Sequence, residues 1–231
     1  MPAASIILIG FSLGIALLDW FAVALSKKNL EFIAKPGVMF VLLVWIWSVG
    51  GFSGHMLWFA IGVVFSLAGD IFLMLPNEQF IPGLLAFLCA HLAYIIGFNP
   101  TLPPVNFASL TLTLLVALTA AQIYRRLTAN TLRAGTKRYK TPISVYTLVI
   151  GLMLLSALVT LVRPDPPDPG GWSVLSSLLV SSGALLFFLS DTLLAWNRFV
   201  APINQARLWV IITYHLGQFG IVFGAALQFI L

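Results

Sequence analysis

Three aspartates lie inside apolar stretches of this 231-residue sequence and are the residues best suited to chemistry. They are Asp19, Asp70 and Asp191, whereas the other four acids lie in polar segments predicted to be loops. An ionisable side chain in an apolar run is costly to bury and is therefore a functional candidate. Two carboxyls in one poorly hydrated pocket suit acid–base chemistry, because desolvation and mutual repulsion favour one protonated and one ionised group. The protonated group can act as a general acid, and the ionised group can activate water.

The elements that must position these residues are membrane-spanning helices. The sequence is 60% hydrophobic and 8% charged, whereas a soluble domain carries about 25% charged residues, so a soluble enzyme and a disordered chain are both excluded. Each apolar run is long enough to cross the hydrocarbon core as a helix. We predict an all-α polytopic membrane helix bundle that forms a single integral membrane domain over residues 1–231. Its eight spans are expected at about 5–25, 36–54, 55–75, 80–98, 105–124, 142–162, 172–196 and 207–230.

Basic residues fall almost entirely on one side of the predicted bundle. Eleven of the twelve lysines and arginines lie in the connections after the first, fifth and seventh spans, and only Arg163 lies on the other side. Basic loops favour the cytoplasm, so both termini are expected on the non-cytoplasmic side. The net charge of +5 is then explained by loops that face an anionic leaflet rather than by nucleic-acid binding. A bacterial inner membrane is the expected location.

Asp70 and Asp191 are expected at the same depth in the membrane. Each lies five residues before the predicted end of its span, about 8 Å inside the cytoplasmic boundary at ~1.5 Å rise per residue. Arg198 and Arg207 lie near the cytoplasmic edge, where they could bind an anionic head group together with Lys35. The other polar side chains expected in this layer are Tyr146, Tyr214 and Gln218, whereas His91 and Tyr94 are expected deeper, near mid-membrane.

Two further sets of residues have simpler explanations. Asp19 is expected to be an interfacial acid paired with a lysine, and the candidates are Lys27, Lys28 and Lys35. The histidines are predicted at three different depths, so they cannot readily share one zinc ion, whose bonds are about 2 Å long. They are His55, His91 and His215. We therefore expect no metal site.

Buried carboxyls of this kind are also compatible with two other classes of protein. A proton-coupled transporter of small molecules or lipids would need the same acids, but it would move its substrate without breaking a bond. A membrane scaffold would use the acids only to join helices by hydrogen bonds, so that replacing them would change stability rather than activity. A zinc-dependent membrane amidohydrolase is disfavoured by the predicted depths of the histidines.

An ordered set of short motifs runs from the second span to the last. The set resembles that of the YhhN family, eight-span integral membrane proteins that include the lysoplasmalogenases. Each motif is short, but their order and spacing together are fairly specific. The motifs are Lys35-Pro36, Gly69-Asp70-x-x-Leu73, Gly83-x-x-x-Phe87-x-x-x-His91-x-x-Tyr94, Tyr146, Gly183-x-x-x-Phe187-x-x-Ser190-Asp191-x-x-Leu194-Ala195, Phe199 and Tyr214-x-x-x-Gln218.

The resemblance implies hydrolysis of the vinyl-ether bond of a lysoplasmalogen or a related lysolipid, without a cofactor. The products would be a fatty aldehyde and a glycerophospho-base. It implies that Asp70 and Asp191 are catalytic, and the sequence does not assign the acid and the base between them. Tyr146 and Arg198 are added as substrate-binding candidates because of their predicted positions. The substrate-binding shell that the resemblance implies consists of Lys35, His91, Tyr94, Ser190, Tyr214 and Gln218.

Overall fold

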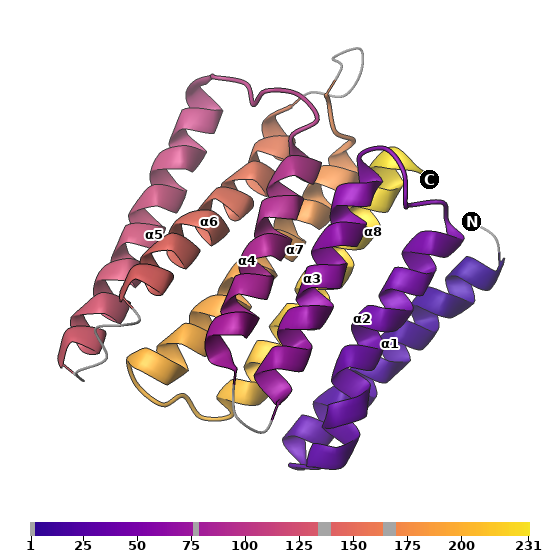
Figure 1. Cartoon of the computed structure of the whole chain (residues 1–231). Coiled ribbons are helices and arrows are strands. Elements are labelled where there is room, and N and C mark those ends of the chain that lie inside the picture. Colours follow the sequence, from indigo (N-terminus) through magenta and orange to yellow (C-terminus); the bar gives the residue numbers. More distant parts are fainter. Residues whose placement is uncertain (1–2, 76–78, 134–139, 164–169) are drawn as a thin grey trace. The chain divides into compact units, whose positions relative to one another are not determined.

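The computed structural model describes residues 3–75, 79–133, 140–163 and 170–231, and within these ranges the chain is helical with no strand. Eight of the helices are long and apolar enough to cross a membrane, which confirms the predicted all-α architecture (Figure 1). These eight helices are α1 (Ala3–Ala24), α2 (Lys28–Ser48), α3 (Met56–Met74), α4 (Phe80–Phe98), α5 (Phe107–Arg133), α6 (Lys140–Val159), α7 (Val174–Phe199) and α8 (Ala206–Phe229), and a short 3-10 helix, η2 (Thr160–Val162), follows α6.

The chain forms two compact units. The first comprises Met1–Gly97 together with Ala225–Leu231, and so it contains α1 to α4 and the end of α8. The second comprises Phe98–Gly224, with α5 to α7 and most of α8. Asp70 belongs to the first unit and Asp191 to the second, and we describe the surroundings of each within its own unit.

Helix α2 begins two turns earlier than predicted, at Lys28 rather than near residue 36. Pro36 therefore lies inside the helix instead of opening it. Membrane helices tolerate an internal proline, because neighbouring groups and small local adjustments satisfy the backbone carbonyl that it leaves without a donor. Glu31 also lies in the first turn of this helix and not in a loop. As a consequence, Lys35 projects from an established helix whose backbone fixes its position.

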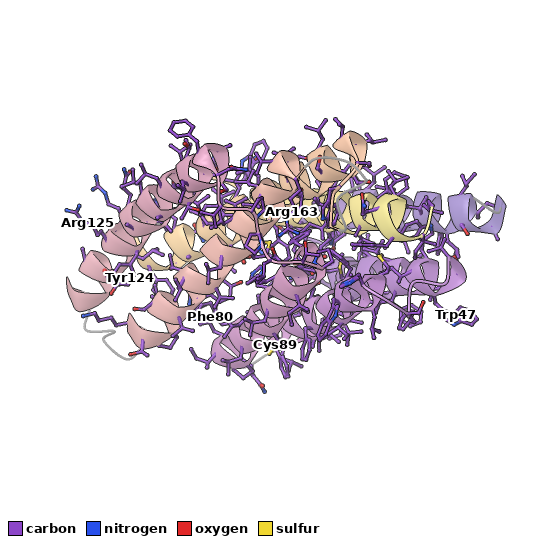
Figure 2. The ribbon with its side chains drawn as sticks, turned by 90° about the horizontal axis from the view of Figure 1, so that it is seen from above. Trp47, Phe80, Cys89, Tyr124, Arg125 and Arg163 are labelled. Carbon is purple, nitrogen blue, oxygen red and sulfur yellow. The ribbon has the colours of Figure 1, made fainter. Side chains whose placement is uncertain are left out.

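Helices α5 and α7 extend beyond their predicted ends, on the side where basic residues gather. Helix α5 continues from the predicted end at residue 124 to Arg133, because the added residues are mostly good helix formers. Arg125 is exposed on this extension, next to Tyr124 (Figure 2). Arg198 lies in the last turn of α7. Lys137 and Arg138, which support the predicted orientation, lie outside the described residues, and the placement of both termini on the non-cytoplasmic side stays a prediction.

In the first unit, α1 packs beside α2 through a narrow stripe of small and polar residues (Figure 1). The hydroxyl of Ser12 donates a hydrogen bond to the carbonyl oxygen of Val38 over 3.0 Å, and the hydroxyls of Ser5 and Ser48 lie 3.4 Å apart. The buried residues of α1 recur at helical spacing and are Ser5, Ser12, Ala16, Asp19, Ala22 and Val23. The rest of α1 is exposed and apolar, which suits a helix that faces lipid. Trp47 of α2 likewise projects outward (Figure 2).

In the second unit, α7 and α8 meet backbone to backbone at three glycines. A Cβ atom added to Gly183 would lie 2.5 Å from the amide nitrogen of Ile221, and one added to Gly217 would lie 2.8 Å from the amide nitrogen of Phe187. A Cβ on Gly220 would lie 2.8 Å from the Cα of Gly183. Small residues at helix contacts let membrane helices approach closely, because lipid tails provide no hydrophobic force between them.

A buried arginine ties η2 to the connection after α4. Arg163 is 5% exposed, and its guanidinium donates hydrogen bonds to the side-chain oxygen of Asn99 over 2.9 Å and to the carbonyl of Thr101 over 3.1 Å. Nearby in the same unit, the rings of Phe98 and Trp172 lie 6.2 Å apart. This buried arginine is the one basic residue that the sequence places on the side opposite the other eleven, and its contacts fit a structural role.

Candidate active site

Asp70 forms an ion pair inside the first unit. Its carboxylate oxygen Oδ1 lies 3.1 Å from the Nζ atom of Lys35, and the Asp70 side chain is 1% exposed while that of Lys35 is 15% exposed. The pair joins α3 to α2. Breaking a buried pair by removing one partner is strongly destabilising, because the remaining charge is left without compensation. The sequence placed both residues in one polar layer, and the structure brings them into direct contact.

Two glycines hold α3 and α4 close together around Asp70. A Cβ on Gly69 would lie 2.6 Å from the ring of Phe87, and a Cβ on Gly83 would lie 2.8 Å from the side chain of Leu73. The two motifs therefore interlock, because each places a glycine under a large side chain of the other. Asp70 directly follows one of these glycines, so this packing fixes the stretch of backbone that carries the carboxyl.

His91 and Tyr94 lie one turn apart on α4, and both are fully buried. The Tyr94 ring occupies the space over Gly62 of α3, and it stacks on the ring of Phe59 with the centroids 5.9 Å apart. The side chain of His91, one turn before Tyr94, is equally buried. The structure thus gives Tyr94 a packing role in addition to the substrate-binding role predicted for it.

Asp191 has a partner of a different kind in the second unit. The hydroxyl of Tyr146, from α6, donates a short hydrogen bond to the Asp191 oxygen Oδ2, which joins α6 to α7. Both residues are half-buried. The sequence predicted Tyr146 at the depth of the aspartates, and the structure shows that its hydroxyl contacts one of them. A phenol beside a carboxyl can orient it and can keep its hydrogen bond while protons move on the other oxygen.

The remaining polar residues predicted in this unit pack between α7 and α8. The hydroxyl of Ser190 donates to the carbonyl oxygen of Val210 over 2.9 Å, so this donor is used within the protein. Tyr214 places its ring against that of Phe187 in an edge-to-face arrangement, with the centroids 5.3 Å apart. Gln218, one turn further along α8, is fully buried. These residues form a well-packed contact between α7 and α8, and one of them, Ser190, directly precedes Asp191.

Arg198 and Arg207 are exposed at either side of the connection between α7 and α8. This connection is held in shape locally, because the Asn197 side-chain oxygen accepts a hydrogen bond from the backbone amide of Ile203 over 2.9 Å. Arg198 lies seven residues after Asp191, which places both on the same face of α7, about 10 Å apart along its axis at ~1.5 Å per residue. An exposed guanidinium at that position can bind a phosphate.

Two features of the site were missed by the sequence reasoning. The full burial of the Asp19 side chain on α1 was not predicted, and two of the three lysines suggested as its partners, Lys27 and Lys28, are exposed. The large side chains that cover the glycines of the motifs were also not predicted. The spacing of small residues on α3 was a usable signal for close packing, but spacing on one helix does not identify the ring that a neighbouring helix supplies.

The described residues contain no group of three or more His, Cys, Asp and Glu side chains that could hold a metal ion. The fold and the site define an all-helical membrane protein in which two aspartates, one in each compact unit, have a polar partner from a neighbouring helix. The chain belongs to the YhhN family, whose sequence profile matches residues 30–225. It is an integral multi-pass membrane protein.

Several named proteins are similar to most of the chain. Human lysoplasmalogenase TMEM86B is 31% identical over 210 residues, which cover 90% of this chain and 76% of the human protein. Human lysoplasmalogenase TMEM86A is 32% identical over 159 residues, 68% of this chain and 60% of that protein. The membrane protein YhhN of Escherichia coli O157:H7 is 26% identical over 216 residues, 91% of this chain and 95% of that protein. No solved structure shows significant similarity to the chain.

Proposed function

We propose that the protein hydrolyses the vinyl-ether bond of a lysoplasmalogen or a closely related lysolipid. The observation that carries the proposal is the pair of partnered aspartates, Asp70 with Lys35 and Asp191 with Tyr146. Both aspartates lie in motifs within the range that matches the YhhN family, and relatives that cover most of the chain are named lysoplasmalogenases. The chemistry of the bond needs an acid and a base, and it needs no redox partner.

The reaction balances with water alone. A proton is added to the vinyl carbon that is not bound to oxygen, which leaves an oxocarbenium ion at the neighbouring carbon. Water attacks this carbon and loses a proton, and the resulting hemiacetal collapses to a fatty aldehyde and the alcohol of the glycerophospho-base. A general acid must therefore deliver the first proton, and a carboxylate must stabilise the cation and accept a proton from water.

The partners of the two aspartates support an assignment of these roles. Lys35 gives Asp70 a positively charged partner, so we assign to Asp70 the carboxylate that stabilises the cation and deprotonates water. Tyr146 gives Asp191 an uncharged partner, whose hydrogen bond can persist when the carboxyl carries a proton, so we assign the general acid to Asp191. The mechanism of vinyl-ether hydrolysis requires both an acid and a base.

The exposed arginines at the end of α7 and the start of α8 are proposed to bind the substrate phosphate. A lysolipid could then keep its tail in the bilayer while its head group stays in water near Arg198. We propose a bacterial inner membrane as the location, with both termini on the non-cytoplasmic side. The basic connections would then face the cytoplasm.

The test is release of aldehyde by purified protein in detergent, followed by an aldehyde-dependent oxidation of NADH in a coupled assay. The protein is offered a lysoplasmalogen and, separately, the saturated ether of the same chain length, which has no vinyl carbon to protonate. Aldehyde from the vinyl ether only is the expected result. If the folded protein releases no aldehyde from either lipid, but moves lipid across vesicles in a gradient-dependent way, the proposal is wrong and transport replaces it.

Replacing Tyr146 by phenylalanine is expected to lower kcat for aldehyde release by about 10- to 100-fold, with little change in KM. The substitution removes the hydrogen bond to Asp191 but keeps the ring, and a hydrogen bond to a charged or proton-carrying group is worth roughly 1.5–3 kcal/mol. Initial rates over a range of substrate concentrations measure the effect. Tyr124→Phe, at a half-buried tyrosine of α5 just before the extension of that helix, is the matched control and should keep the wild-type rate.

A further inference from the structure

Asp19 is a buried carboxyl that the proposed reaction does not yet use. Its side chain is fully buried in the stripe through which α1 faces α2. It lies outside the range that matches the YhhN family, because that match begins at residue 30. Burying an acid in a membrane helix is costly, and such residues generally serve a substrate pathway or a proton site.

The contacts between α1 and α2 place Asp19 at the level of the Lys35 ammonium. Ser12 is hydrogen-bonded to the carbonyl of Val38, and the two helices run antiparallel. Asp19 lies seven residues after Ser12 on α1, and Glu31 lies seven residues before Val38 on α2. Seven residues make about two helical turns, so both residues lie on the faces through which the two helices contact each other. Lys35 lies one turn after Glu31, and a helical side chain leans toward the N-terminus of its helix. The ammonium is thus directed toward the level of Asp19.

We propose that Asp19 is a positioning residue that shares the Lys35 ammonium with Asp70. Lys35 is already paired with Asp70 from the α3 side, and the register of α1 on α2 leads us to infer that Asp19 reaches the same ammonium from the α1 side. Two carboxyls on one ammonium hold the lysine head between two helices. They also prevent it from neutralising Asp70 completely, so that Asp70 keeps the basicity needed to accept a proton from water. The inference rests on the proposed function, because it acts on the role assigned to Asp70.

Asp19→Asn is expected to lower kcat for aldehyde release by about tenfold, while KM changes by less than about twofold. The amide keeps the size of the side chain but removes its charge, so that of the two carboxylates only Asp70 still pairs with the Lys35 ammonium. A loss in kcat without a change in KM is the signature of an interaction made in the transition state. Asp19→Glu, which restores the charge, should recover most of the rate.

A double-mutant cycle with Lys35→Met separates this role from a merely structural one. If Asp19 acts through Lys35, adding Asp19→Asn to Lys35→Met should cause no further loss of rate. It should also raise the Tm of the Lys35→Met protein, because it removes one of two like charges that the lysine no longer compensates. Ser12→Ala, in the same buried stripe, is the packing control and should keep the wild-type kcat.

The outcomes distinguish this inference from the function on which it rests. Wild-type activity in Asp19→Asn, or losses that multiply in the double variant, would overturn the role of Asp19 while the reaction stands. If the wild-type protein releases no aldehyde, the proposed function fails, and the cycle is judged by Tm alone. Additive changes in Tm would then overturn the shared ammonium as well, whereas coupled changes would support it as a feature of the fold.

Discussion

The Asp191→Asn protein, purified in detergent, is expected to release aldehyde from a lysoplasmalogen at least about 10²-fold more slowly than the wild type. An asparagine fills the same space and can still accept a hydrogen bond from Tyr146, which reaches Asp191 from α6. It cannot deliver a proton to the vinyl carbon, and positioned acid–base catalysis contributes typically 10²–10⁴-fold. The measurement is the initial rate of the coupled aldehyde assay at saturating lipid.

Asp70→Asn tests the second carboxyl, and we expect it to lower the rate of aldehyde release by a factor of the same order. It removes the proposed base and leaves the Lys35 ammonium without its partner at 3.1 Å. This variant must also be checked for folding, since an uncompensated buried charge is destabilising. Lys35→Met combined with Asp70→Asn removes both charges of this pair and should still not restore the rate, because the proposed base remains absent. Near-wild-type turnover by both Asp70→Asn and Asp191→Asn would contradict the proposed catalytic role of these aspartates.

The second large effect is expected on stability. Gly183→Ala should lower the free energy of unfolding by about 2 kcal/mol or more, since overpacking a well-packed contact costs roughly 1–3 kcal/mol and occasionally more. The added Cβ would lie 2.5 Å from the Ile221 amide nitrogen and 2.8 Å from the Gly217 carbonyl oxygen. These are backbone atoms that no rotamer change can move away. Thermal unfolding in detergent should show a Tm lower by about 4–8 °C.

Gly151→Ala is the matched control for this substitution. Gly151 also lies in a helix of the second unit, but its added Cβ would meet only ordinary contacts, 3.6 Å from the Cβ of Ala120 and 3.9 Å from Val116. Alanine has a better helix propensity than glycine, so this Tm should stay level or rise. An equal fall in both variants would show that the cost comes from glycine loss in general, and the close approach of α7 and α8 would lose its support.

Much of the fold could be predicted because a membrane imposes it. The apolar runs are separated by loops rich in proline and glycine, and this pattern is enough to predict eight helices, which the structure confirms. Helix ends were less predictable. Pro36 suggested a helix start, but the helix continues through it back to Lys28. Lys35 therefore sits about two turns inside α2 instead of at its edge, and from there it reaches Asp70.

Candidate site residues could be chosen from the sequence, but the contacts between them could not be predicted. Depth along a helix follows from counting residues, so Asp70, Lys35 and Tyr146 could be assigned to one layer. Which polar group pairs with which aspartate depends on the rotation of each helix and on its neighbours, and neither follows from a single sequence. Asp19 shows the same limit, because depth alone suggested an interfacial acid and only the packing of α1 on α2 buries it. That the paired residues act in catalysis stays a prediction.

The glycine contact between α7 and α8 has a mechanical consequence. Side chains that interlock can change rotamer and let two helices slide or separate by small steps, but a seam of bare backbone at Gly183, Gly217 and Gly220 has no such intermediate positions. Helices α7 and α8 should therefore move together as one rigid unit that carries Asp191. If the protein acts on a lipid as proposed, the lipid tail is not expected to pass between α7 and α8 at these glycines, because no side chain there can move aside.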